Sequence, residues 1–143
     1  MTRRVLVTRP EPGASATAER LKAMGFVPVV LPLTRIVPVR PPEPGPCDAV
    51  AVTSANALRH APEDLIASLA KKPLFAVGDA TAEAARQAGF ADVRAAAGTA
   101  ADLAAMMGGA LPPGARILHL AGRDRTEGFG EDLRRLGFAV EIA

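Results

Sequence analysis

Short apolar runs alternate with stretches of helical spacing along almost the whole chain, and this alternation restricts the fold more than any other feature. Residues 4–9 form an apolar, β-branched run that ends at a turn rich in proline and glycine. Residues 16–24 have helical spacing, with Ser15 as the expected cap and Gly25 as the expected stop. A second apolar run covers residues 26–31. Because two strands joined by a helix lie parallel in one sheet, the pattern predicts an α/β protein.

The same alternation continues to the end of the sequence. Further strands are expected at residues 49–52, 74–77, 91–95, 116–120 and 140–142. Helices are expected from Ser54 and at residues 62–69, 81–88, 100–107 and 127–136, with Gly108 and Gly109 ending the fourth of them. Five strands alternating with helices predict a flavodoxin-like, doubly wound parallel sheet that forms one complete domain.

Prolines recur between residues 32 and 46, where neither a helix nor a central strand tolerates them. We interpret this stretch as an extended connection between domains. Residues 1–36 are then expected to hold a partial first domain, a β-α-β unit with a linker strand. Residues 37–143 are expected to form the second flavodoxin-like domain.

An internal repeat supports this division. A shift of 112 residues places Val5-Leu6-Val7-Thr8 on Ile117-Leu118-His119-Leu120, and Leu21, Gly25 and Phe26 on Leu133, Gly137 and Phe138. Duplication explains the match as two similar domains that each contain this unit. The alternative, that any two β-α-β units look alike, stays open.

Composition excludes several classes of protein. The 17 Lys and Arg are spread along the chain and the net charge is only +2, so the basic stripe of a nucleic-acid binder is absent. The mild basic excess is explained either by binding of a small anionic ligand or by a solvated surface alone. The single cysteine, Cys47, cannot form an internal disulfide, which favours a reducing compartment. No apolar run reaches transmembrane length and no leader pattern opens the chain, so we expect a cytoplasmic protein.

Polar residues and glycines follow four of the predicted strands, where doubly wound sheets bind ligands. These candidates are Arg9, then Thr53, Ser54 and Asn56, then Gly78 and Thr81, and finally Arg123. Such corners offer unpaired backbone N–H groups and the positive end of a helix dipole to an anion.

A structural explanation competes at each corner. Thr53, Ser54 and Thr81 are residue types that commonly cap helices. A tight turn explains Gly78, and exposure to solvent explains Arg9 and Arg123. His60 and His119 are isolated in the sequence, and core packing explains His119 better than catalysis. Asp79, Asp124 and Glu127 form a possible carboxylate cluster whose spacing selects no metal.

Four motifs taken together resemble the uroporphyrinogen-III synthase family. They are V-L-V-T-R-P at the start, D-A-V-A-V-T-S-A-N-A-L in the middle, F-A-V-G-D-A-T-A-E-A-A-R-Q-A-G-F later, and I-L-H-L-A-G near the end. The T-S-x-N-A-L and V-G-x-x-T elements carry most of the resemblance, which covers the whole chain in order.

The resemblance implies two flavodoxin-like domains with the substrate, the linear tetrapyrrole hydroxymethylbilane, in the cleft between them. It implies a lyase of porphyrin and haem biosynthesis that forms uroporphyrinogen III, with the last pyrrole ring inverted through a spiro intermediate and with no metal or organic cofactor. Carried over by motif, Thr53, Ser54, Asn56, Gly78 and Thr81 line the cleft. Arg9 approaches from the other domain and Arg123 from the last corner, with Thr81 and Ser54 nearest the departing hydroxide.

The sequence also departs from the family pattern. The family continues with a return strand carrying a tyrosine and with a second half, whereas this chain has no tyrosine. We therefore expect weak or no activity from the chain alone, and self-association through residues 1–31, whose apolar sheet edge lacks a partner. The alternatives are a catalytically inactive fragment and a flavodoxin-like module that binds a small anion.

Overall fold

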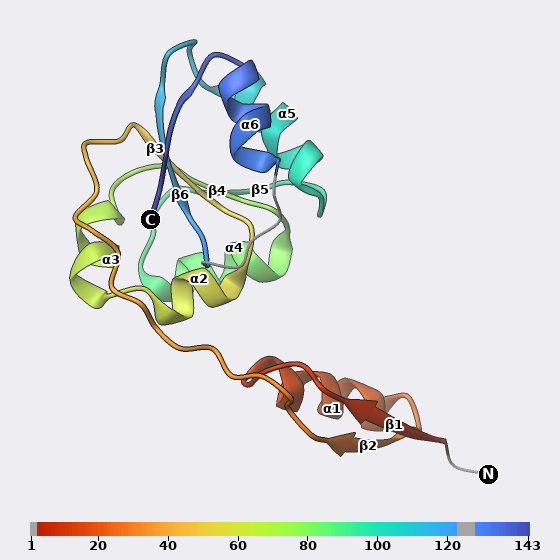
Figure 1. The fold of residues 1–143 in the computed structure, drawn as a ribbon. Coiled ribbons are helices and arrows are strands. Elements are labelled where there is room, and N and C mark those ends of the chain that lie inside the picture. Colours follow the sequence, from red (N-terminus) through yellow and green to blue (C-terminus); the bar gives the residue numbers. More distant parts are fainter. Residues whose placement is uncertain (1–2, 123–127) are drawn as a thin grey trace. The chain divides into compact units, whose positions relative to one another are not determined.

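In the computed structural model, which describes residues 3–122 and 128–143, contacts divide the chain into two units. Unit 1 is Met1–Pro38 and unit 2 is Val39–Ala143. Unit 1 contains the first two strands and the first helix, and unit 2 contains the other elements; all are labelled in Figure 1. Of the candidate site residues, Arg9 alone belongs to unit 1, and the others belong to unit 2.

Unit 1 is a single β-α-β motif. Strand β1 (Arg4–Val7) pairs parallel with β2 (Val27–Val30), and helix α1 (Gly13–Ala23) connects them. Val7 of β1 is buried together with Ala14 and Ala18 of α1. The small alanine side chains let the helix backbone approach the strands closely, so this unit packs without any large core residue.

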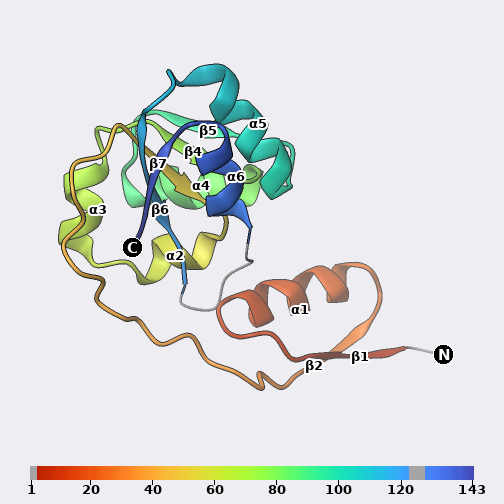
Figure 2. The same ribbon diagram turned by 45° about the horizontal axis from the view of Figure 1, so that its top comes forward.

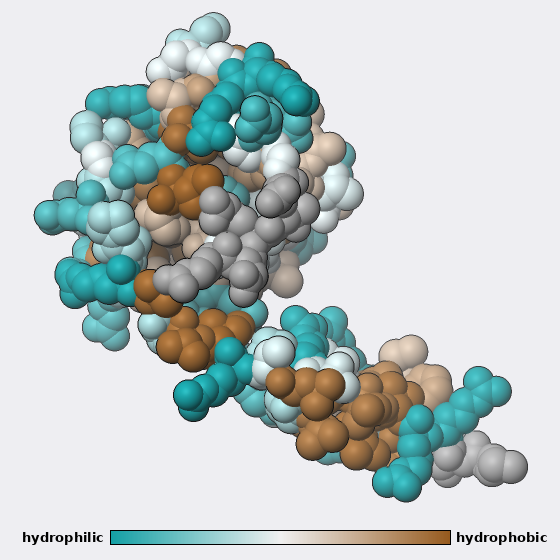
Figure 3. Space-filling view, viewed as in Figure 1, coloured by the Kyte–Doolittle hydropathy of each residue, from teal (hydrophilic) through white to brown (hydrophobic). Residues whose placement is uncertain are grey.

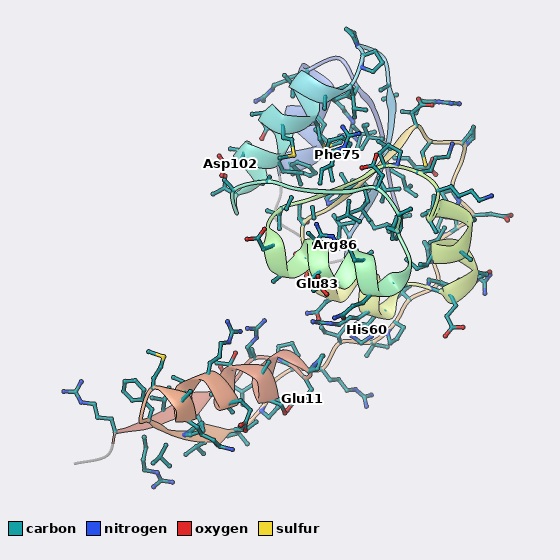
Figure 4. The ribbon with its side chains drawn as sticks, turned by 180° about the vertical axis from the view of Figure 1, so that it is seen from behind. Glu11, His60, Phe75, Glu83, Arg86 and Asp102 are labelled. Atoms are coloured by element: carbon teal, nitrogen blue, oxygen red, sulfur yellow. The ribbon has the colours of Figure 1, made fainter. Side chains whose placement is uncertain are left out.

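The start of α1 differs from the prediction. The helix begins at Gly13, and Ser15 is not its cap. Instead the Glu11 carboxylate accepts hydrogen bonds from the Ser15 backbone N–H (3.0 Å) and the Ser15 hydroxyl (2.8 Å). Figure 4 labels Glu11 at this end of the helix. A carboxylate at a helix N-terminus satisfies an N–H group and complements the dipole, so Glu11 does what we expected of Ser15.

The two edges of the unit 1 sheet are not equivalent. The Val27 N–H donates to Arg3 and the Leu31 N–H donates to Val7, so alternate residues of β2 turn their backbone groups toward β1. Pro28, between them, is turned to the outer edge, where it has no N–H to offer. On the outer edge of β1, Leu6 presents both its backbone N–H and its carbonyl group. Within the described residues, no strand pairs with that edge.

Unit 2 is built on a parallel sheet of five strands. They are β3 (Ala49–Val52), β4 (Leu74–Ala76), β5 (Val93–Ala95), β6 (Arg116–Leu120) and β7 (Ala139–Ile142). Their order is β5-β4-β3-β6-β7, and every pairing is parallel. The predicted doubly wound sheet is confirmed. The winding reverses between β3 and β6, which makes this pair the topological switch point.

Helices cover both faces of this sheet. They are α2 (Ala55–His60), α3 (Glu63–Leu69), α4 (Asp79–Ala88), α5 (Ala100–Ala110) and α6 (Phe129–Arg135). Helices α2, α3 and α4 lie on one side and α5 and α6 on the other (Figures 1 and 2). Two buried clusters match these layers. Leu58, Ile66 and Ala82 pack on one face, while Leu103, Met107 and Leu133 pack on the other.

The predicted end of α5 at Gly108 and Gly109 is wrong. The helix continues through both glycines to Ala110, and the Leu111 N–H donates to the Met107 carbonyl at 3.0 Å. Met107 is fully buried against the sheet. Packing of this face holds the last turn in place despite the low helix propensity of glycine.

Exposed large apolar side chains are concentrated near the start of the chain. Among the described residues they are Leu6, Met24, Val27, Val30, Leu31, Leu33, Val37 and Val39, and then Leu136 alone in the remainder. Figure 3 shows a brown, apolar surface over unit 1. Among the described residues, no helix is both long and apolar enough to cross a membrane.

Candidate ligand site at the carboxyl edge of the sheet

The corner between β3 and α2 places three of the candidate residues next to the switch point. All four residues of β3 are buried, and the chain reaches the surface at half-buried Thr53 and exposed Ser54. Ser54 is the N-cap of α2, with its hydroxyl oxygen accepting from the Asn56 N–H at 3.3 Å. This capping role uses a lone pair of Ser54 and leaves its hydroxyl proton available for a ligand.

Asn56 faces along its own helix. Its side-chain oxygen accepts from Arg59 Nη1 at 3.4 Å. This contact engages the amide oxygen of Asn56 within α2. A carboxylate would instead accept from the NH2 group of Asn56, so binding does not require this contact to break.

The side chain of Thr53 contacts a buried histidine, His119. Thr53 Oγ1 and His119 Nε2 are 3.2 Å apart, although the two residues are 66 positions apart in sequence. His119 is 2% exposed and its ring meets Phe129 edge-on, with centroids 4.9 Å apart. The prediction that His119 packs in the core is confirmed. Its contact with a candidate site residue was missed, because no local pattern in the sequence indicates that β3 and β6 are neighbours.

The next corner joins β4 to α4. Gly78 is the N-cap of α4, and no side chain caps the helix. The first N–H groups of α4 are therefore open to an incoming acceptor. Gly78 has φ −167°, which is extended backbone, so the tight-turn explanation for this glycine is wrong. A Cβ at Gly78 would lie 3.5 Å from Gly98 Cα, which shows that the next loop passes close by.

Thr81 lies in the first turn of α4 and is only 6% exposed. A side chain this buried presents little surface to a ligand. Ser54, by contrast, is exposed. The geometry therefore favours Thr53 and Ser54 over Thr81 as hydroxyl groups that a ligand reaches, and the role expected for Thr81 remains a prediction.

Helix α5 provides a contrast at the same edge of the sheet. Thr99 and Asp102 form a complete capping box, in which the Asp102 N–H donates to Thr99 Oγ1 (3.1 Å) and the Thr99 N–H donates to Asp102 Oδ2 (3.3 Å). Asp102 is labelled at this helix start in Figure 4. The N-terminus of α5 is satisfied by its own side chains. An anion at this edge is therefore better received at α4 than at α5.

Neither predicted arginine is among the described residues that form these corners. Arg9 belongs to unit 1, where its Nη1 donates to Thr17 Oγ1 at 3.3 Å and its guanidinium lies over Gly13. Its approach to the corners of unit 2 stays a prediction. Arg123 falls outside the described residues, as do Asp124 and Glu127 of the possible carboxylate cluster.

Two other kinds of reactive group add no second site within the described part of the chain. Burial raises the pKa of the Cys47 thiol above its usual value, which makes the nucleophilic thiolate less available. Across residues 3–122 and 128–143, no three side chains of the metal-binding types gather into a group that would hold an ion.

The fold and the corner together define a class. This is a doubly wound α/β protein with hydroxyls beside the switch point and the open N–H groups of α4 after the neighbouring strand, the edge at which such proteins bind small ligands. The family model described as uroporphyrinogen-III synthase HemD matches residues 15–143. The chain belongs to the uroporphyrinogen-III synthase family.

Solved structures agree with this assignment at the level of the fold. The chain is similar to a uroporphyrinogen III synthase from Thermus thermophilus, with a TM-score of 0.55, 22% identity, and coverage of 99% of this chain and 60% of that one. It is also similar to the uroporphyrinogen-III synthetase from Helicobacter pylori 26695, with a TM-score of 0.55, 18% identity, and coverage of 100% and 60%. The chain thus spans about 60% of the length of these proteins. No curated protein matches.

Proposed function

We propose that the chain takes part in tetrapyrrole biosynthesis as a lyase that cyclises hydroxymethylbilane to uroporphyrinogen III. The observation that carries this proposal is the family match over residues 15–143. The corner at the switch point supports it, because its groups suit a ligand rich in carboxylates.

The substrate carries carboxylate side chains on every pyrrole, and carboxylates accept hydrogen bonds without donating any. Thr53 and Ser54 supply hydroxyl donors at the start of α2, and α4 supplies uncapped N–H groups. We assign Arg9 and Arg123 as further donors on the strength of their family motifs. These contacts would hold the linear tetrapyrrole folded, and this fixed geometry is the main contribution that catalysis needs here.

In the proposed reaction, hydroxide leaves the hydroxymethyl carbon and the N–H of the same pyrrole loses its proton, so that water is lost overall and an azafulvene forms. The substituted carbon of the last pyrrole attacks it and forms a spiro intermediate. That intermediate fragments and closes again with the ring inverted. Ser54 is the exposed hydroxyl best placed to donate a hydrogen bond to the departing hydroxide, with Thr81 as the second choice because of its burial.

A second candidate is a module that binds a polycarboxylate without turning it over. The observation that favours it is the corner itself, whose hydroxyls and uncapped N–H groups suit carboxylates whether or not a reaction follows. Both candidates use the same corner, and only the first yields the inverted isomer.

The deciding experiment is incubation of the chain with freshly prepared hydroxymethylbilane, followed by oxidation and chromatographic separation of uroporphyrins III and I. A III-to-I ratio well above the control without protein supports the synthase. If only type I forms, the synthase proposal fails for this chain. Fluorescence titration with uroporphyrin III then tests the binding module, with Thr53→Val/Ser54→Ala as the variant that should lose binding.

A further inference from the structure

We propose that His119 is a positioning residue that holds the Thr53 hydroxyl ready to donate to a carboxylate of the ligand. This inference rests on the proposed function for the identity of the ligand, and on the contact between Thr53 and His119 for the positioning itself. The I-L-H-L-A-G motif contains this histidine, but the resemblance gives it no role.

The strand register places the two side chains on one face of the sheet. His119 pairs with Ala51 across the switch point, and Thr53 follows Ala51 by two residues. Because side chains alternate along a strand, Thr53 continues the face of Ala51 and reaches the histidine ring. The resulting distance from Oγ1 to Nε2 is 3.2 Å.

The surroundings make a histidine costly here unless its nitrogens are used. Its neighbours Ile117, Leu118 and Leu120 are apolar and almost fully buried, and His119 itself is 2% exposed. A buried polar ring loses its hydration, which a hydrogen bond offsets. Phe129, the first residue of α6, meets the ring at an interplanar angle of 75° and limits its rotation.

The chemistry of the ligand fixes the direction of the hydrogen bond. A carboxylate accepts only, so the Thr53 hydroxyl has to direct its proton outward to bind one. The oxygen then receives its inner hydrogen bond from His119, which requires a proton on Nε2. In the opposite tautomer, Nε2 would accept the proton of the Thr53 hydroxyl. The Thr53 oxygen would then present only lone pairs to the ligand.

The test combines two measurements on the chain and four variants. Nitrogen-15 NMR of the histidine ring reports which nitrogen carries the proton. Three-bond couplings to Thr53 Cγ2 report whether its χ1 angle is fixed. The variants are His119→Leu, His119→Gln, Thr53→Val and the double variant His119→Leu/Thr53→Val. Glutamine places an N–H donor near the position of Nε2, so it is the conservative replacement.

We expect a protonated Nε2 and a single Thr53 rotamer in the wild type, the same single rotamer in His119→Gln, and averaged couplings in His119→Leu. In a titration with uroporphyrin III, His119→Leu and Thr53→Val should each weaken binding about tenfold, with no further loss in the double variant. His119→Gln should restore most of the affinity. Leu118→Val, on the opposite face of β6, is the control that lowers stability without changing affinity.

An unprotonated Nε2, wild-type affinity in His119→Leu, or additive losses in the double variant would each overturn the inference. If the wild type does not bind uroporphyrin III, the proposed function fails instead. The ring tautomer and the Thr53 couplings then decide on their own whether His119 positions the hydroxyl.

Discussion

Arg116 and Asp48 tie together the amino ends of β6 and β3. Arg116 Nη2 lies 2.8 Å from Asp48 Oδ1, and Nε and the backbone N–H of Arg116 both donate to Oδ2, at 3.1 and 2.8 Å. These hydrogen bonds hold the pKa of the Asp48 carboxyl well below its usual range. The pair therefore joins the two strands of the switch point at the end opposite the candidate site.

Asp48→Asn should lower the urea midpoint at pH 7. Because the pKa of Asp48 is lower in the folded state than in the unfolded state, the ionised carboxylate stabilises the fold above the unfolded value of 3.8. This contribution is lost as the pH falls toward the folded pKa. The difference between the wild type and Asp48→Asn should accordingly shrink below pH 3.8, as urea titrations over a pH series would reveal.

Asp92→Asn is the matched control. Arg94 binds Asp92 through the same two nitrogens, at 3.2 and 3.1 Å, but these residues are two positions apart and join no second strand. We expect a smaller effect from Asp92→Asn. Equal losses in the two variants would mean that Asp48 acts only as a surface charge.

Two glycines should respond in opposite directions to alanine. Gly89 ends α4 with φ +106°, where an alanine is strained, so Gly89→Ala should destabilise the fold by about 1 kcal/mol. Gly109 lies inside α5, and no atom lies within 4 Å of the position that a Cβ would take there, so Gly109→Ala should stabilise by up to about 1 kcal/mol. Thermal unfolding followed by circular dichroism measures both, and a loss of stability in Gly109→Ala would contradict the extended α5 helix.

Two variants of Ser54 should separate capping from binding. Aspartate caps helices as well as serine does, so Ser54→Asp should keep the stability that Ser54→Ala loses, about 1 kcal/mol. The added negative charge at the corner should weaken uroporphyrin III binding. Ser68→Asp, on α3, adds the same charge away from the corner and should leave the affinity unchanged. Unweakened binding by Ser54→Asp would exclude Ser54 from the site.

Self-association should depend on Leu6. Its side chain is 57% exposed on β1, whose outer edge has no partner among the described residues. We expect dimers by light scattering at tens of micromolar, and monomers for Leu6→Lys. Leu136→Lys, at the exposed apolar residue that follows α6, is the control that should still associate. A monomeric wild type would refute this prediction.

Local patterns in the sequence were enough to predict the order of the elements. Apolar runs and positive-φ glycines such as Gly25 and Gly137 mark the strands and several helix ends. The errors arose where a neighbouring side chain outweighs local preference. Glu11 caps α1 from four residues before Ser15, and buried Met107 holds the glycines of α5 in the helix.

The candidate site was harder to predict for a different reason. Thr53 and Ser54 were found from their position after a strand, which is a local signal. The contact between Thr53 and His119 depends on β3 lying beside β6, and four helices and two strands separate that pair along the chain. Nothing near either residue specifies this neighbour, so the histidine was assigned to the core alone.

Pro28 sets a limit on how far unit 1 can assemble. Growth of a β-sheet fibre requires two receptive edges on each molecule, one to join the end of the fibre and one to receive the next molecule. Unit 1 has a receptive edge at β1, while the edge at β2 lacks the N–H of Pro28. Once two copies have paired through their β1 edges, the two edges that remain exposed are those of β2, which lack the N–H of Pro28. Assembly should therefore stop at the dimer.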